Sequence, residues 1–110
     1  MTQPVDLEAL AALKDIMEDE FTALVQTYLA DAQARVLLLH ELLSQDDLDE
    51  IRKNAHSLKG SSSNLGASLL TDLCFQVEQQ SKNNQSQGLD TLLSQIDEEF
   101  LLVKEALVNC

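Results

Sequence analysis

The stretch IRKNAHSLKGSSSNLG, residues 51–66, combines a helical repeat with a signal that ends it. On a helical wheel of about 100° per residue, one narrow stripe carries the core-forming side chains. The stripe consists of Ile51, Ala55, Leu58, Ser62 and Leu65. Gly66 follows it in the position of a left-handed helix cap. We therefore predict a helix that begins at Asp46 or Asp47 and runs through Leu65.

Similar three- and four-residue spacings predict four further helices. A short first helix, capped by Asp6, has an apolar side made of Leu7, Leu10, Leu13 and Ile16. The second, residues 18–43, has apolar positions at Phe21, Val25, Tyr28, Ala32, Val36, Leu39 and Leu43. The fourth, residues 67–82, buries Leu70, Leu73, Cys74 and Val77. After a polar loop at 82–88 that Gly88 closes, the last helix carries Leu89, Leu92, Leu93, Ile96, Phe100, Val103 and Leu107.

Composition agrees with an all-α protein. The 110 residues include 45% hydrophobic side chains, but only three glycines and one proline. A chain so poor in helix breakers favours long helices, and short connections favour antiparallel neighbours. We predict one domain over residues 1–110, an up-and-down antiparallel four-helix bundle with a short extra N-terminal helix.

The charge balance excludes several function classes. A net charge of −12 and a pI of about 4.2 disfavour binding to nucleic acid or to an anionic membrane surface. No apolar run is long enough to span a bilayer, and MTQPVDLEAL has neither a basic lead nor an apolar signal core. We expect a cytoplasmic protein that binds no membrane.

Several chemistry-bearing residues have structural interpretations. Cys74 is expected in the core and Cys110 is incidental at the terminus. His40, near the end of the second helix, is favoured there by the helix dipole. The one tyrosine, Tyr28, and the three phenylalanines lie on apolar stripes and are expected in the core.

His56 differs from these residues because it lies about 140° from the core stripe of its helix. Gly60, at about 180°, is one turn further along on the same side, and leaves space for another molecule's backbone. Arg52 and Ser63 share that outer side, and Lys59 lies nearer its margin. The wheel thus predicts an exposed, uncrowded histidine flanked by cations.

Three functions remain open from these residues alone. Neutral imidazole is a nucleophile that can take up a phosphoryl group, and neighbouring cations would stabilise the added charge. The same face could instead serve a passive helical adaptor or docking domain, or His56 could act in a helical phosphatase or other acid/base enzyme. We find no glycine-rich nucleotide loop and no magnesium-binding acidic cluster in the sequence.

The segment HSLKGSSSNLGA, residues 56–67, resembles the signature of histidine-containing phosphotransfer (HPt) domains, and LCFQVEQQSK, residues 73–82, is similar to a second segment of that family. The resemblance implies a phosphorelay carrier, not a kinase, in which His56 accepts phosphate, through Nε2, from one receiver-domain aspartate and passes it to another. It implies Lys59 as the basic neighbour and Gly60 as the clearance residue. With these we group Arg52 as a further phosphate-supporting cation, and Ser62, Ser63 and Asn64 beside the site or at the partner interface.

The resemblance also implies the partners. They are the receiver domains of hybrid sensor histidine kinases and of response regulators, and Mg²⁺ is expected in the receiver while this chain binds no cofactor. The chain, with its own Met1, resembles the stand-alone bacterial type, and we expect a monomer.

Overall fold

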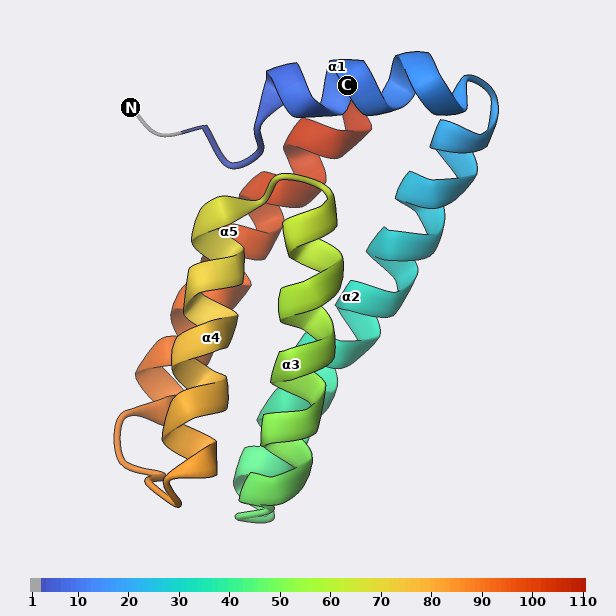
Figure 1. Cartoon of the computed structure of the whole chain (residues 1–110). Coiled ribbons are helices and arrows are strands. Elements are labelled where there is room, and N and C mark those ends of the chain that lie inside the picture. Colours follow the sequence, from blue (N-terminus) through green and yellow to red (C-terminus); the bar gives the residue numbers. More distant parts are fainter. Residues whose placement is uncertain (1–2) are drawn as a thin grey trace.

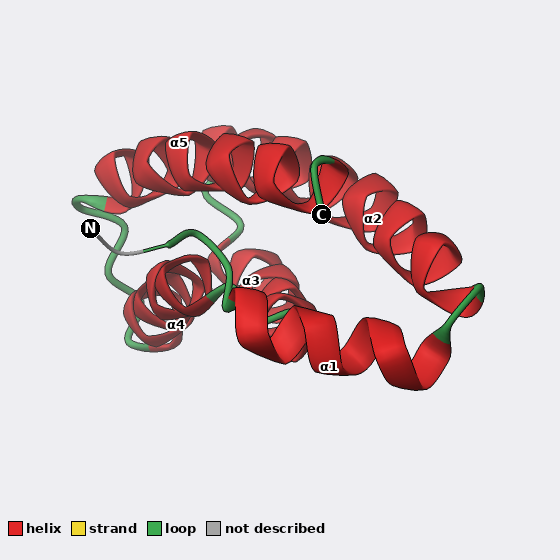
Figure 2. Cartoon of the chain, turned by 90° about the horizontal axis from the view of Figure 1, so that it is seen from above, coloured by secondary structure: helices red, strands yellow, loops and turns green. Residues whose placement is uncertain are grey.

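Five helices and no strand make up residues 3–110, the part of the chain that a computed structural model describes. They are α1 (Leu7–Met17), α2 (Glu20–Ser44), α3 (Leu48–Asn64), α4 (Ser68–Lys82) and α5 (Leu89–Val108). Helices α2 to α5 run up and down as an antiparallel bundle, and α1 crosses one end of it (Figures 1 and 2). The predicted fold class is confirmed. Met1, on which the expectation of a stand-alone module drew, lies outside the described residues.

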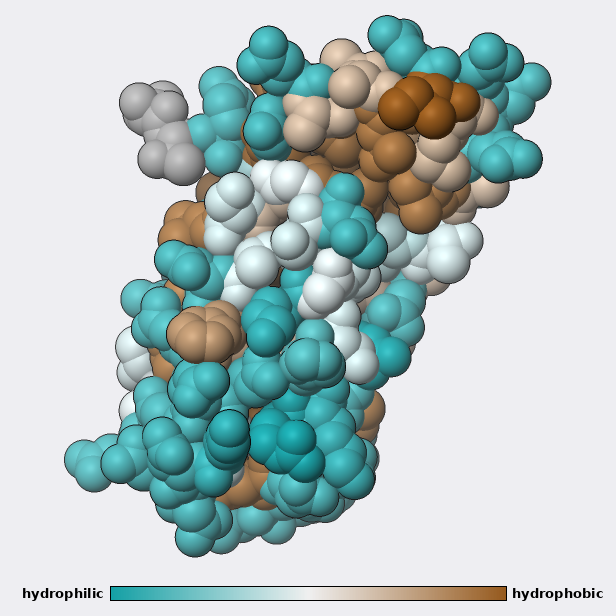
Figure 3. All heavy atoms as spheres, in the orientation of Figure 1, coloured by the Kyte–Doolittle hydropathy of each residue, from teal (hydrophilic) through white to brown (hydrophobic). Residues whose placement is uncertain are grey.

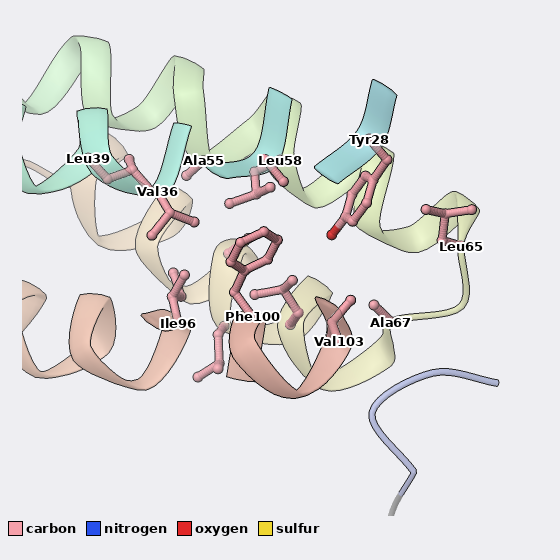
Figure 4. Packing of buried hydrophobic residues seen from close by; sticks show 14 of the residues in the cluster. Tyr28, Val36, Leu39, Ala55, Leu58, Leu65, Ala67, Ile96, Phe100 and Val103 are labelled. Atoms are coloured by element: carbon pink, nitrogen blue, oxygen red, sulfur yellow. The ribbon is translucent and has the colours of Figure 1, made fainter. Parts of the chain in front are cut away.

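The core is built almost entirely from aliphatic side chains. Figure 4 shows the ring of Phe100 from α5 next to Leu58 of α3, with Val36 of α2 to one side. These three side chains are at most 5% exposed. Each has the helical phase expected from the sequence, so the apolar stripes of α2, α3 and α5 meet in one interior.

The apolar stripe of α2 ends one residue earlier than predicted. Leu42 is buried, whereas Leu43 is only half-buried. A step of three residues from Leu39, instead of four, keeps the stripe in line, because repeated steps of four rotate it around the helix by about 40° each.

Helix α1 has the predicted cap but a smaller buried face than expected. The Asp6 carboxylate accepts a hydrogen bond from the Ala9 N–H at 3.0 Å. Only Leu10 is buried, whereas Leu7 is exposed and Ile16 is 80% exposed. Each step of three residues turns the apolar side by about 60°, so Leu10 and Leu13 meet the core while the two end positions of the predicted side remain exposed. Helix α1 lies across the end of the bundle (Figure 2).

The ends of α3 follow the signals in the sequence. The Asp47 carboxylate caps its start by accepting from the Glu50 N–H at 3.2 Å. Gly66 ends the segment with a φ of 74°, and its carbonyl accepts from the Asp6 N–H at 2.9 Å. A Cβ at Gly66 would lie 2.9 Å from the Asp6 Cβ, so both the backbone angle and the close approach require glycine here.

The surface of the α3–α4 face changes character along its length. In Figure 3 its lower part is strongly hydrophilic, the upper part of α3 shows the pale colour of small residues, and an apolar area lies over α1. Phe75 on α4 is 44% exposed, so the prediction of three buried phenylalanines is wrong for this one. Within residues 3–110, no helix is both long and apolar enough to cross a membrane.

The two cysteines and His40, which were given structural roles from the sequence, lie as follows. Cys74 is buried and Cys110 is exposed, as predicted. His40 Nε2 lies 2.9 Å from both carboxylate oxygens of Asp97 on α5. The histidine therefore joins two helices, a contact that the dipole interpretation did not include.

Candidate functional site

His56 projects from the outer side of α3 into solvent. Its side chain is 64% exposed, which confirms the prediction from the wheel. The opposite side of the same helix is anchored in the core, where Ile51, Ala55 and Leu58 are fully buried. The imidazole is therefore presented to approaching molecules from a rigid element.

Glu78 of α4 holds the imidazole from one side. Its Oε2 lies 2.9 Å from His56 Nδ1, and its own side chain is 15% exposed. Burial raises the pKa of the Glu78 carboxyl, but hydrogen bonds from Lys59 and His56 outweigh burial and hold that pKa below its usual value. The carboxylate is ionised at neutral pH and can only accept hydrogen bonds, so the proton of a neutral ring is on Nδ1. The nucleophilic lone pair of the imidazole is then on Nε2.

Lys59 shares the same carboxylate. Its Nζ lies 2.7 Å from Glu78 Oε1, and it also lies over the ring of Phe75, 5.4 Å from the centroid. Because the ammonium has three donors, the ion pair leaves others for a new acceptor. Lys59 is thus held one turn from His56, in reach of a group attached to the imidazole.

Gly60 leaves an opening beside the histidine. A Cβ built at this position would meet no described atom within 4 Å outside its own turn of helix. The glycine therefore has no packing role that alanine would disturb, although it weakens the helix by about 1 kcal/mol. Its contribution is that no side chain projects from the surface next to the imidazole.

This arrangement has a counterpart in a known family. The sequence model described as the Hpt domain matches residues 23–106, well over half of the chain. The chain belongs to the Hpt domain family. Hpt domains are phosphotransfer carriers that work with receiver domains in two-component phosphorelays.

Solved structures agree with this assignment. The Hpt domain is similar to a crystal structure of histidine-containing phosphotransfer protein B (HptB) from Pseudomonas aeruginosa, with 34% identity and a TM-score of 0.94, covering 99% of this chain and 95% of that one. It also resembles the histidine-containing phosphotransfer protein ZmHP2 from maize, with 27% identity, a TM-score of 0.83, and coverage of 93% and 84%. A search of curated protein sequences found no match.

The other residues predicted around the site are not all brought together. Arg52 lies one turn before His56, but its Nη2 pairs with Asp49 Oδ1 at 2.9 Å and not with the imidazole. Ser63 and Asn64 are exposed on the last turn of α3. Ser62 is fully buried, with its hydroxyl 2.8 Å from that of Tyr28. Its place in the core stripe is confirmed, and of its two predicted positions, beside the site or at the partner interface, burial excludes the interface.

Glu78 is the residue that sequence reasoning missed. It is the acidic end of the LCFQVE segment, one turn after the buried Cys74 and next to Val77. A carboxylate at the margin of an apolar stripe requires a partner, because an unpaired buried charge is costly. The position of Glu78 beside the apolar stripe could have indicated that it has a partner. The sequence of α4 alone could not identify that partner, because it lies on α3.

The described residues offer no metal site. No group of three or more histidine, cysteine, aspartate or glutamate side chains in residues 3–110 is arranged to hold a metal ion. His56, Lys59 and Glu78 form a cluster in which the histidine and the lysine both donate to the single carboxylate. The cluster suits an anionic group more than a cation.

The shared carboxylate makes stability depend on pH. The pKa of Glu78 is lowered in the folded protein, so its contribution is present above its ordinary value of 4.5 and is lost as the pH falls through the lower folded value. We expect parent and Glu78→Gln to differ by about 1 kcal/mol in unfolding free energy at neutral pH, and this difference to shrink as the pH falls below 4.5. Urea unfolding at each pH measures this. A difference that stays constant over this range would contradict the assigned ion pairs.

Proposed function

We propose that this Hpt domain accepts a phosphoryl group on Nε2 of His56 from the receiver aspartate of a hybrid sensor histidine kinase and passes it to the receiver aspartate of a response regulator. The observation that supports this most is the exposed His56 ring whose Nδ1 is held by the ionised Glu78 carboxylate. That contact leaves the nucleophilic nitrogen on the open side of the pair.

The transfer step follows from this geometry. The Nε2 lone pair attacks the phosphorus of the aspartyl phosphate in line, a P–N bond forms, the P–O bond to the aspartyl group breaks, and the aspartate carboxylate leaves. The imidazole becomes positively charged while Nδ1 keeps its proton. Glu78, 2.9 Å from Nδ1, stabilises that positive charge. The reverse step delivers the phosphoryl group to the second receiver.

The cations near His56 have a supporting role in this proposal. A phosphoryl group brings about −1.5 to −2 charges at neutral pH, by analogy with other phosphorylated side chains. Lys59, already 2.7 Å from Glu78, donates a further hydrogen bond to the phosphoryl oxygens. Arg52 adds a longer-range positive charge from the preceding turn.

The rest of the machinery belongs to the partners. The receiver supplies the aspartate and the Mg²⁺ that neutralises the phosphoryl oxygens, and this chain holds no cofactor and phosphorylates nothing from ATP. We place the exchange in the cytoplasm, with the Hpt domain acting as a monomer.

The test is incubation with a phosphorylated receiver domain and Mg²⁺. We expect label to appear on the Hpt domain in a bond that acid hydrolyses and base does not, and no label from ATP without a kinase. A passive adaptor would bind the receiver and acquire no label. A helical phosphatase would turn over a small phosphate ester with no second protein present, and either of these results would overturn the proposal.

Lys59→Ala is expected to slow phosphorylation of His56, or to shorten the lifetime of the product, by roughly tenfold, the effect of one charge-assisted hydrogen bond. Lys53→Ala is the matched control, since it removes a cation from the same helix that pairs with Asp49 and Glu50. Label formation and decay are followed over time in all three proteins. Equal rates for Lys59→Ala and the parent would remove the electrostatic role while leaving His56 as the carrier.

A further inference from the structure

A groove between α4 and α5 lies away from the His56 site. On the α4 wheel, its residues Leu69 and Leu73 are about 140° or more from Glu78. The groove has a volume of about 240 Å³ and is lined by Leu69, Leu73, Gln95, Glu98, Glu99 and Leu102. Nothing in the phosphotransfer proposal uses this surface.

Glu99 is the unusual member of the lining. The residue is only 7% exposed, and none of residues 3–110 forms a hydrogen bond or an ion pair with its carboxylate. Burial raises its pKa. Glu99 as a residue is 93% buried and lines the groove, so its carboxylate has solvent in the groove, and no cation among residues 3–110, as its partner.

The walls of the groove are apolar and accessible. Leu69 on α4 and Leu102 on α5 are 44% and 51% exposed, and Leu73 lies beneath them. Glu98, which is exposed, adds a second carboxylate at the rim. The groove therefore combines leucine walls with negative charge at its floor and edge, a combination that fits a long apolar stem ending in a cation.

We propose that this groove docks a partner protein through an amphipathic helix that inserts one arginine between leucines. The arginine stem would lie along Leu69 and Leu102, and its guanidinium would pair with the Glu99 carboxylate. Arginine suits the site better than lysine because its planar fork binds a carboxylate with two hydrogen bonds and is less strongly hydrated. The partner's leucines would cover the exposed parts of the walls.

Charge argues for such a partner over a second copy of this chain. A copy would bring its own Glu98 and Glu99 against the same carboxylates, in a protein whose net charge is already −12. A basic segment would be attracted by that field and would satisfy Glu99. The docking surface would leave His56 open, so a partner could hold the Hpt domain while a receiver exchanges phosphate with it.

The probe for this proposal is a synthetic helical peptide with one arginine flanked by leucines, compared with the same peptide carrying citrulline, a neutral residue of the same shape. Calorimetric titration of the full chain is expected to give at least tenfold weaker binding for the citrulline peptide. Glu99→Gln is expected to weaken the arginine peptide at least tenfold and to melt no lower than the parent, since it removes a buried charge. Glu41→Gln, which removes an exposed carboxylate on α2, is expected to change binding less than twofold.

Backbone amide shifts locate the bound peptide. We expect changes on α4 and α5 around Leu69, Leu73 and Leu102, and the same affinity in His56→Gln. Equal binding by the parent and Glu99→Gln, shifts centred on α3, or equal affinity for both peptides would overturn the proposal. So would concentration-dependent dimerisation that Leu102→Ser abolishes, since that would identify a second copy as the occupant.

Discussion

His56→Gln is expected to accept no phosphate at all from a phosphorylated receiver. An amide nitrogen has no nucleophilic lone pair, so glutamine preserves polarity and size while removing the reacting atom. Because the side chain is 64% exposed, the substitution leaves the core untouched and the melting temperature close to that of the parent. Transfer of labelled phosphate and thermal melting, measured on the same preparation, separate chemistry from folding.

The second histidine of the chain provides the matched control. His40→Gln removes an imidazole that Asp97 binds on the α2–α5 side of the bundle, and it is expected to leave phosphate acceptance unchanged. If His56→Gln still became labelled while His40→Gln did not, the carrier would be His40. If both became labelled, neither histidine would be the sole acceptor.

Gly60→Gln is expected to slow phosphotransfer roughly a hundredfold while stabilising the helix by up to about 1 kcal/mol. No described atom outside its own turn of α3 lies within 4 Å of a Cβ at this position, so the new side chain fits the isolated protein. It would occupy space beside the imidazole that an approaching receiver needs. Stability and transfer would then change in opposite directions, which a folding defect cannot produce.

Gly60→Ala distinguishes clearance from backbone freedom. Alanine adds only one methyl group and, like glutamine, favours helix more than glycine does. A clearance role therefore predicts a small loss of transfer with alanine and a large loss with glutamine. Rates from a phosphorylated receiver, with melting curves for all three proteins, decide between the two. Equal losses for both variants would mean that flexibility of the α3 backbone matters, and no loss with either would remove Gly60 from the partner surface.

The helix boundaries were predictable to within two residues because their signals are local. Asp6 and Asp47 cap helices with their own carboxylates, and Gly66 and Gly88 adopt positive φ where the chain must turn. Each of these signals acts within three or four residues. Only the close approach of Asp6 to Gly66 involves a segment distant in the sequence.

Two of the errors were within reach of the helical wheel. Ile16 lies about 120° from the buried Leu10 of α1, and Phe75 lies about 160° from the buried Val77 of α4, and both side chains are exposed. Exposure of His56 was predictable because it lies opposite a continuous core stripe on one helix. The contact between His56 Nδ1 and Glu78 Oε2 was not predictable, because the two residues lie on different helices. A helical wheel describes one helix and does not show how two helices are placed.

All three charged members of the site come from a single helical hairpin. His56 and Lys59 lie on α3, Glu78 lies on α4, and only the Gly66 turn separates the two helices. Contacts between segments close in sequence cost little loop-closure entropy and tend to form early in folding. Packing of α3 against α4 therefore brings the three charged side chains together through contacts that are local in sequence.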